Sequence, residues 1–497
     1  MTGQPNIVVI MADQQRADLC AREGFPLDTT PFTDELAGEG TWFDRAHTTS
    51  PLCCPARTSL LTGRYPSAHR VRENPAAHEA VFAADLPGLL RDSGYATGLS
   101  GKNHSYLRAA DLDHFADYSH VGAVDPGTAR EREFDEWLLH LRHRTHPEPT
   151  PFPLELQCPH RIVSDAQRWL DSLSGQPFFL WLSFPEPHNP YQVPEPYFSM
   201  FPPEQLPPVR YGPEALREQP FAWRYLRTLG ETGDPGYAAS IDRARANYCG
   251  MLRLIDDQIR RFVTFLDQRG LRADTLLFIT SDHGDYVGEY GLLRKGAELP
   301  ELLTRVPFVV NGPGVATQRG PHPAHVSLAD VFPTVCEAIG EPIPDGVQGR
   351  SLWPMLRGAD YPAAEFASAY VEQGIGGLPY EAEDVPEPLP GLGGADGWST
   401  FDELNAVTQS GSRRAIRCGD WKLVVDGAGS CRLHHLPEDP GELRDVSAEH
   451  PGMLTELLRE LVLWMLRTED PLPLPHNGYR RKRDPRNYLA PYRVDRS

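Results

Sequence analysis

The chain of 497 residues has little cysteine, no long apolar run and no excess of positive charge. Its eight cysteines are scattered and form no Cys-x-x-Cys pair, which argues against a disulfide framework and a cysteine-bound structural zinc. No segment approaches the roughly 20 apolar residues of a membrane helix. A formal net charge of −20 disfavours nucleic acid and anionic membranes as partners. An anionic small substrate stays open if its site gathers cations locally.

The N-terminal stretch has a six-residue apolar run, Ile7–Ala12, and no basic leader. A signal peptide needs both a basic region and a longer apolar core, so this run indicates a buried strand instead. We therefore expect a cytoplasmic protein. Further strand-like runs alternate with helical patterns; they are YATGLSGK, PFFLWLSF, DTLLFITSDHG and VPFVVNGPG. This alternation predicts an α/β fold with a large, mostly parallel sheet between layers of helices.

The composition of the sequence changes after about residue 366. A long Pro- and Gly-rich loop, Gly374–Gly397, precedes strand-like pieces around residues 413–436 and a helical run at Met453–Thr468. We predict a catalytic α/β domain over residues 1–366. Residues 367–497 would form a smaller C-terminal α+β subdomain with a short antiparallel sheet and a basic tail.

Polar residues follow two of the predicted strands where each strand ends. Asp13 and Gln14 follow the first strand, and Asp282 and His283 follow the strand that begins near Asp274. Ligands of open α/β sheets bind beyond the carboxyl ends of the strands. Carboxylate, amide and imidazole groups suit one divalent ion, Ca²⁺ or Mn²⁺, with Mg²⁺ as a further candidate. The alternative is a helix-capping aspartate and a hydrogen-bonded histidine.

Basic side chains follow predicted strand ends as well, where they would converge on an anion. They are Lys102, His104, His188 and Lys295. Arg57 lies in the segment SPLCCPARTSLLTG, Ser50–Gly63, which predicts a helix that begins near Cys53. The N-terminus of such a helix adds backbone N–H donors for the same anion.

The same segment resembles the signature of the type I, formylglycine-dependent sulfatases of the alkaline phosphatase superfamily. The residues that carry the resemblance are Cys53-x-Pro55-x-Arg57 and Leu61-Thr62-Gly63. The segments NIVVIMADQQ, GKNH, PHNP and TSDHGDYVGEYGLLRKG resemble other blocks of the family, in the same order. The likeness covers nearly the whole chain and implies an alkaline-phosphatase-like fold.

The resemblance also implies a chemical change at one of the two adjacent cysteines. Cys53 lies two positions before the proline and would be oxidised to Cα-formylglycine by a separate formylglycine-generating enzyme. Cys54 occupies a variable position. The hydrated aldehyde would attack the sulfur of a sulfate monoester and form a covalent sulfo-enzyme. Its second hydroxyl would then expel sulfate by C–O cleavage.

Roles for the remaining residues follow from the resemblance alone. Asp13, Gln14, Asp282, His283 and the converted Cys53 would hold the metal. Arg57 would orient the formylglycine, and Lys102 and Lys295 would neutralise sulfate oxygens. His104 would assist breakdown of the hemiacetal, and His188 would protonate or bind the leaving oxygen. Asn74 would contact the sulfate or the substrate.

The sequence departs from the commonest family pattern at Gln14 and His283, where many members have Asp and Asn. This difference leaves the identity of the metal open. The alternatives are a phosphonate monoester or phosphodiester hydrolase of the same superfamily, and an unconverted, catalytically silent anion-binding protein. A redox protein using Cys53 and Cys54 fits poorly, because a disulfide between adjacent cysteines is strained. Sugar, aryl and alkyl sulfates are all candidate substrates, and a homo-oligomer held by the tail is left open.

Overall fold

A computed structural model of the chain describes residues 4–234, 236–384 and 403–469. In this part of the chain the main sheet has eight strands in the order β2-β9-β8-β1-β7-β4-β5-β6. The strands are β1 (Asn6–Asp13), β2 (Thr41–Phe43), β4 (Ala96–Lys102), β5 (His114–Ser119), β6 (Gly122–Ala123), β7 (Phe178–Pro187), β8 (Thr275–Ser281) and β9 (Phe308–Asn311). Strands β8, β1, β7, β4 and β5 run parallel, whereas β9 and β6 are antiparallel to their neighbours β8 and β5.

The apolar run of β1 shows why the sheet needs two helical layers. Successive side chains of a strand point to opposite faces. Ile7, Val9 and Met11 enter one apolar core, and Val8 and Ile10 enter the other. Both faces are therefore covered, which explains why this strand reads as a continuous apolar run.

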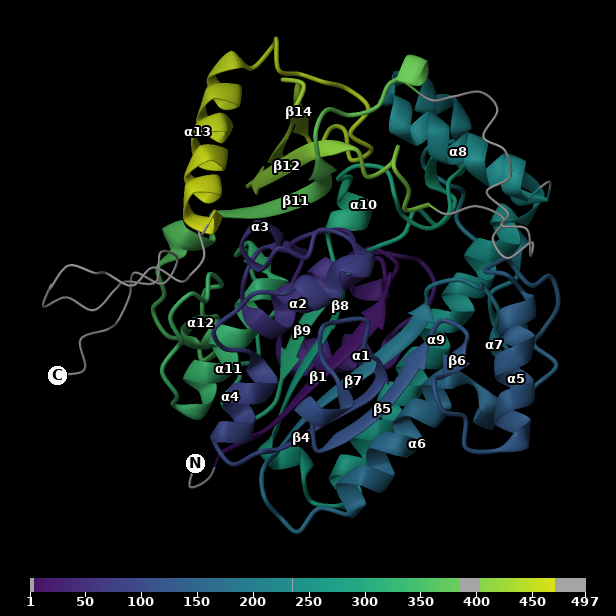
Figure 1. Cartoon of the computed structure of the whole chain (residues 1–497), viewed down its shortest axis with the longest axis vertical. Coiled ribbons are helices and arrows are strands. Elements are labelled where there is room, and N and C mark those ends of the chain that lie inside the picture. The colour runs from purple at the N-terminus through teal and green to yellow at the C-terminus, as the bar shows by residue number, and fades with distance from the viewer. Residues whose placement is uncertain (1–3, 235, 385–402, 470–497) are drawn as a thin grey trace, which may run out of the picture.

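Two groups of helices cover the two faces (Figure 1). On the first face lie α2 (Cys53–Thr62), α4 (Leu86–Asp92), α11 (Val331–Ile339) and α12 (Trp353–Leu356). On the second lie α1 (Pro31–Glu39), α5 (Ala129–His140), α6 (Cys158–Asp171) and α9 (Tyr237–Gln268). Further helices are α3 (Pro66–His69), α7 (Tyr197–Met200), α8 (Phe221–Gly233) and α10 (Glu301–Thr304).

A second, antiparallel sheet lies beyond one end of the main sheet (Figure 1). Its strands are β11 (Ser368–Gly376), β12 (Gly411–Cys418), β13 (Trp421–Asp426) and β14 (Cys431–His435), and α13 (Pro451–Thr468) packs against it. The strands β3 (Ala46–His47) and β10 (Val326–Ser327) form a short parallel pair. Tyr65, which directly precedes α3, packs into the core under α13.

The predicted fold class is confirmed: a large mixed sheet between helices, with a small antiparallel sheet near the C-terminus. The division of the chain at residue 366 stays a prediction. The long helix expected over Asn247–Gly270 begins ten residues earlier, at Tyr237. Most of the Pro- and Gly-rich loop and the whole basic tail lie outside the described residues.

Candidate active site

The side chains singled out in the sequence come together at the carboxyl ends of four neighbouring parallel strands. β1 ends at Asp13, β4 ends at Lys102, and His188 directly follows β7. Asp282 and His283 follow β8. Cys53 is the first residue of α2, so its side chain enters the same space from a helix N-terminus. This placement confirms the expectation that strand ends gather the polar residues.

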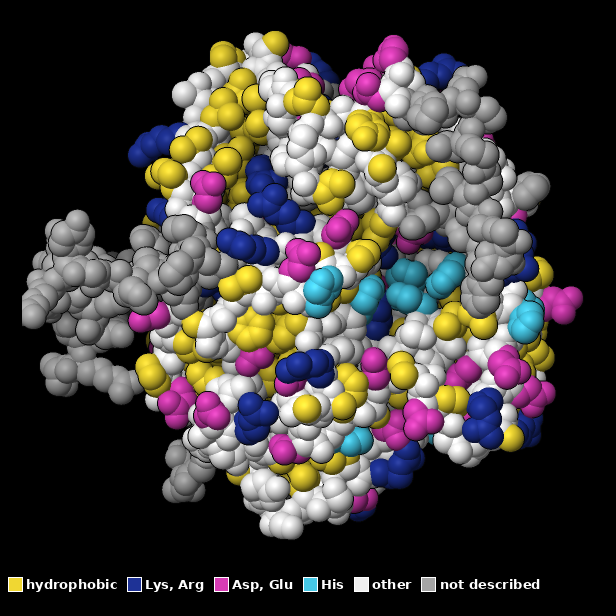
Figure 2. Space-filling view, viewed as in Figure 1, with side chains coloured by type: hydrophobic (Ala, Val, Ile, Leu, Met, Phe, Trp, Pro, Cys, Tyr) yellow, Lys and Arg dark blue, Asp and Glu magenta, His cyan; other side chains and the backbone are white. Residues whose placement is uncertain are grey.

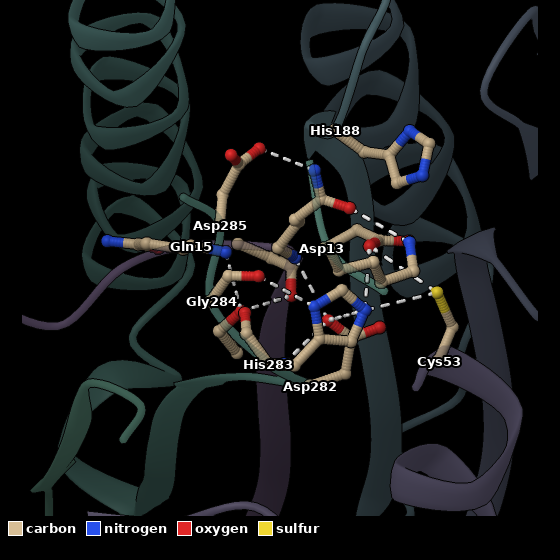
Figure 3. Close-up of polar contacts among 12 residues, drawn as sticks. Asp13, Gln15, Cys53, His188, Asp282, His283, Gly284 and Asp285 are labelled. Atoms are coloured by element: carbon tan, nitrogen blue, oxygen red, sulfur yellow. Dashed lines mark hydrogen bonds and ion pairs between the residues drawn. The ribbon is translucent and has the colours of Figure 1, made fainter. Parts of the chain in front are cut away.

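Four of these side chains form a compact cluster of metal-binding groups. One ligand atom each of Asp13, Cys53, Asp282 and His283 lies within 4.8 Å of the others, and all four residues are buried. Figure 3 shows the sulfur of Cys53 directed at the His283 ring, with the two aspartates beside it. The distance from Cys53 Sγ to His283 Nε2 is 3.3 Å, and Asp13 Oδ1 lies 3.7 Å from the same sulfur.

The hydrogen bonding of His283 tests whether a cation fits this cluster. Nδ1 lies 2.9 Å from the carbonyl oxygen of Gly284, and because a carbonyl only accepts, Nδ1 must donate. Nε2 then faces Asp13 Oδ1 and Asp282 Oδ1, each at 3.7 Å. Burial alone would lower the pKa of His283, but Asp282 and Cys53 raise it above its usual value. The site thus favours positive charge at its centre, which fits a divalent ion held by oxygen and nitrogen donors.

Gln14 presents its amide oxygen to the site. Its Nε2 donates to Asp285 Oδ2 at 2.5 Å, and its Oε1 accepts from Lys295 Nζ at 2.9 Å. The backbone of Gln14 is left-handed, with φ of 71°, and its N–H donates to Asp282 Oδ1 at 3.0 Å. A non-glycine residue held in this conformation is typical of functional sites. Asp285 was not predicted from the sequence, although it lies two residues beyond the predicted ligand His283.

Arg57 is completely buried beside the cluster and joins three elements. Its Nε donates to Asp282 Oδ2 at 2.9 Å, and Nη1 donates to the carbonyl of Lys102 and to Ser183 Oγ, both at 2.8 Å. The guanidinium also lies over the Trp181 ring, 5.6 Å from its centroid. Arg57 therefore fixes α2 relative to β4, β7 and β8.

Two lysines surround the Cys53 sulfur with positive charge. Lys102 Nζ donates to Asp13 Oδ2, and Lys295 Nζ lies 3.8 Å from Glu403 Oε1. Burial and Asp13 would raise the pKa of the Cys53 thiol, but Lys102, Lys295 and His283 together hold it well below its usual range. Burial would likewise raise the pKa of the Asp13 carboxyl group, but the neighbouring Lys102 holds it well below its usual value. The site is built for an anionic group at residue 53 or bound beside it.

Histidines form the wall of the site next to Lys102, and two of them were not predicted from the sequence. His104 and His188 were predicted, whereas His120 and His143 were not. The rings of His120 and His188 stack with centroids 3.6 Å apart, and His143 lies 6.0 Å from His120. Histidine side chains gather along a hollow on the face shown in Figure 2. His120 and His143 follow no predicted strand end, so the sequence carried no signal for them.

Cys54 and Asn74 lie beside the site in a different role. Cys54 is buried, and its backbone N–H donates to Asn74 Oδ1 at 3.1 Å. The oxygen of Asn74 thus holds the first turn of α2, next to Cys53. Contact of Asn74 with a substrate stays a prediction.

The chain shows the features of an alkaline-phosphatase-like hydrolase: a metal-binding cluster and cations at the strand ends of this sheet. The sequence model of the Sulfatase family matches residues 5–341. A multifunctional alkaline phosphatase superfamily protein, PehA of Trinickia caryophylli, is 32% identical over 71% of this chain and 77% of its own. A choline-sulfatase of Rhizobium meliloti is 28% identical over 90% of this chain and 83% of its own. The chain belongs to the sulfatase family, and it is a sulfuric ester hydrolase.

Solved structures agree on the fold. The phosphonate monoester hydrolase of Agrobacterium radiobacter matches with a TM-score of 0.76 and 24% identity, over 94% of this chain and 96% of that one. At this identity the likeness concerns the fold alone. Among the described residues, no helix is both long and apolar enough to cross a membrane.

Proposed function

We propose that the protein hydrolyses a sulfate monoester with a nucleophile made from Cys53, to give an alcohol and inorganic sulfate. One observation carries the proposal. Cys53 touches two predicted metal ligands, Asp13 and His283, and its thiol is held in an anion-stabilising field by Lys102 and Lys295. A thiol with only a structural role needs neither metal-binding neighbours nor two buried lysines.

Cys53 would be converted to Cα-formylglycine, whose hydrated aldehyde supplies the attacking hydroxyl. A divalent ion bound by Asp13, Gln14, Asp282 and His283 would favour ionisation of that hydroxyl. Ca²⁺ and Mn²⁺ fit the donors, with Mg²⁺ as a further candidate.

The surrounding residues would perform the rest of the chemistry. Arg57 positions the turn that carries residue 53. Lys102 and Lys295 would neutralise the charge of the sulfate oxygens in the transition state. His104 would take the proton that must leave the second hydroxyl when sulfate is expelled. Its pKa is lowered by burial and by Lys102, so it is neutral and able to accept that proton.

His188 would face the leaving oxygen. Its Nδ1 lies 2.8 Å from the carbonyl of Asn189 and must donate there, so Nε2 carries the lone pair. Burial, then Lys295 and Lys102, hold the pKa of His188 well below its usual value. In the resting site His188 is therefore neutral and binds a hydroxyl by accepting its hydrogen bond. It would become the acid after taking up the proton that the attacking hydroxyl releases, and it would pass that proton to the leaving oxygen.

Mass spectrometry of the peptide that spans Ser50–Gly63 tests the nucleophile. Conversion of Cys53 lowers the peptide mass by about 18 Da, because the thiol is replaced by an aldehyde. The protein should come from its native host, and Cys53→Ala provides the unconverted control. An unchanged wild-type peptide, together with no hydrolysis of any sulfate ester, would instead support the silent anion-binding protein.

A phosphonate monoester or phosphodiester hydrolase is the second candidate. The pattern of Gln14 with His283 is compatible with it. The pair Lys102 and His104 supports sulfate. Parallel kinetics on an aryl sulfate and a phenyl phosphonate ester separate the two, and a far higher kcat/KM on the phosphonate would overturn the sulfatase proposal. A panel of sugar, aryl and alkyl sulfates would then identify the organic part.

Three further expectations accompany this function. Maturation would require a formylglycine-generating enzyme as a transient partner. A cytoplasmic location and a homo-oligomer stay predictions, which cell fractionation and light scattering can test.

A further inference from the structure

Behind the histidine wall lies a second set of buried polar groups, of which only His188 has a part in the chemistry so far. A small cavity of about 10 Å³ lies between β7 and His120. His120, Glu186, His188 and Gln192 line it, together with the apolar side chains of Leu138, Pro185 and Pro190. A volume of about 10–15 Å³ holds one water molecule, provided that two or more polar partners face it.

His120 supplies the first partner. Its Nε2 lies 2.9 Å from Lys102 Nζ, and an ammonium group only donates, so Nε2 must accept. The ring is therefore neutral with its hydrogen on Nδ1. That atom is buried and has no hydrogen-bond partner within the described ranges 4–234, 236–384 and 403–469. A buried N–H without an acceptor is costly, so it calls for one.

Glu186 supplies the second partner. The residue is 8% exposed, and its Oε2 is buried without a hydrogen-bond partner in the described part of the chain. Burial raises the pKa of Glu186 to about 8. At neutral pH the group is mostly the uncharged acid, which still has a carbonyl oxygen to accept a hydrogen bond. The amide of Gln192 is already engaged, because it accepts from Thr150 Oγ1 and donates to Gln157 Oε1.

We propose that Glu186 is a positioning residue, which holds His120 through one buried water so that His120 aims Lys102 at the sulfate group. The water accepts from His120 Nδ1 and donates to Glu186. His120 Nε2 then keeps its lone pair toward Lys102. The inference deepens the proposed function, on which it rests for the role of Lys102.

The arrangement acts on both sides of the sulfate. Lys102 Nζ donates both to Asp13 and to His120, so the two contacts together fix its ammonium group. The His120 ring stacks on His188 at an interplanar angle of 28°. Loss of the Glu186 contact would therefore disturb Lys102 and the ring that meets the leaving oxygen.

The hydrogen position on His120 can be measured without any substrate. In mature protein labelled with ¹⁵N at histidine, long-range ¹H–¹⁵N correlation spectra distinguish the two neutral tautomers and the imidazolium. His120→Gln removes one signal and so assigns it. We expect the Nδ1–H tautomer. An Nε2–H tautomer or an imidazolium at pH 7 would overturn the proposal, whatever ester the enzyme hydrolyses.

Two substitutions at Glu186 then test its role in positioning. Glu186→Gln keeps an oxygen that accepts from the water, and we expect its kcat to stay near that of the wild type. Glu186→Met cannot accept, and we expect kcat to fall by about 10-fold or more with little change in KM, because Lys102 acts mainly in the transition state. Glu195→Met, on the exposed surface beyond β7, controls for the loss of a carboxylate.

Several outcomes would contradict the role of Glu186. Wild-type kcat in Glu186→Met would do so. If Glu186→Met does not fold, Glu186→Gln decides, since a kcat as low as about one tenth of wild type would mean that an accepting oxygen is not what the site needs. Activity on no ester at all, with the predicted tautomer present, would count against the proposed function and not against the positioning of His120.

Discussion

The carboxylate of Asp285 determines which end of the Gln14 amide faces the metal-binding cluster. Asp285 Oδ2 accepts from Gln14 Nε2 at 2.5 Å and from Tyr191 Oη at 2.6 Å. Its other oxygen accepts from the backbone N–H groups of Val287 and Arg294, at 2.7 and 2.8 Å. With four donors directed at it, this carboxylate can only accept. The amide oxygen of Gln14 is therefore left for the cluster and for Lys295.

Asp285→Asn should weaken metal binding. In one orientation of the new asparagine, its NH₂ group would face the NH₂ group of Gln14. The Gln14 amide would then rotate and direct its NH₂ group at the cation. We expect a 10- to 100-fold rise in the dissociation constant of Ca²⁺ or Mn²⁺, which is the usual effect of losing such a supporting contact. Calorimetric titration of chelator-treated protein measures it.

Asp256→Asn is the matched control for that experiment. Asp256 is also a buried aspartate, but it accepts from Thr33 Oγ1 and from the backbone at the start of α1, away from the cluster. Its substitution should lower the melting temperature and leave the metal dissociation constant unchanged. Equal losses of metal affinity in both variants would show that Asp285 acts through general stability alone.

Arg57→Lys should damage both stability and activity, although the charge is kept. One ammonium group cannot reach Asp282, Ser183 and the Lys102 carbonyl together, and it loses the planar contact with Trp181. We expect a loss of about 2 kcal/mol in the free energy of unfolding and about a 100-fold fall in kcat/KM. Urea unfolding and steady-state kinetics check these values.

Arg350→Lys separates the two effects of the Arg57 substitution. Arg350 is equally buried and pairs with Asp330 Oδ2 at 3.0 Å, in a different part of the fold. The Arg350→Lys variant should lose a similar free energy of unfolding, while its kcat/KM stays near that of the wild type. A parallel fall in activity would mean that Arg57 serves the fold only.

Cys54→Ser should leave the enzyme active. Burial raises the pKa of the Cys54 thiol well above its usual value, so this sulfur is a poor nucleophile, in contrast to Cys53. Burying a hydroxyl in its place would cost about 1–2 kcal/mol of stability. We expect full conversion of Cys53 and a kcat within about 3-fold of wild type, whereas Cys53→Ser should lose at least about 1000-fold. An inactive Cys54→Ser variant that melts normally would reopen the redox interpretation.

The strand ends were predictable from the sequence because parallel strands place their carboxyl ends at one edge. Asp13, Asp282 and His283 needed only the strand pattern before them, and all three lie in the cluster. Pro55 and Gly63 predicted the helix that begins at Cys53. In the structure Gly63 directly follows the last helical residue and has a left-handed backbone, with φ of 63°. Local strand and helix patterns therefore sufficed to predict most residues of the candidate site.

The supporting residues were not predictable in the same way. His120 reaches Lys102 from beyond β5, and Glu403 reaches Lys295 from a segment more than 100 residues away along the chain. Neither belongs to a periodic pattern, because each contact depends on how distant segments pack. The long helix α9 was placed correctly but begun too late, since Tyr237–Ala246 carries many polar and small residues before its continuous apolar face.

The stability of the protein should fall between about pH 5 and pH 8 because of Glu186. Burial raises the folded-state pKa of this group to about 8, against an ordinary value near 4.5. In that window the folded chain binds a proton that the unfolded chain releases, so rising pH favours unfolding. Glu186→Gln carries no such proton, so its melting temperature should gain on the wild type by about 2–5 °C from pH 5 to pH 8. Asp256, whose pKa burial raises to about 6, titrates in both proteins, so its contribution cancels in this difference. A temperature difference that stays flat across this range would show that Glu186 is ionised in the folded protein.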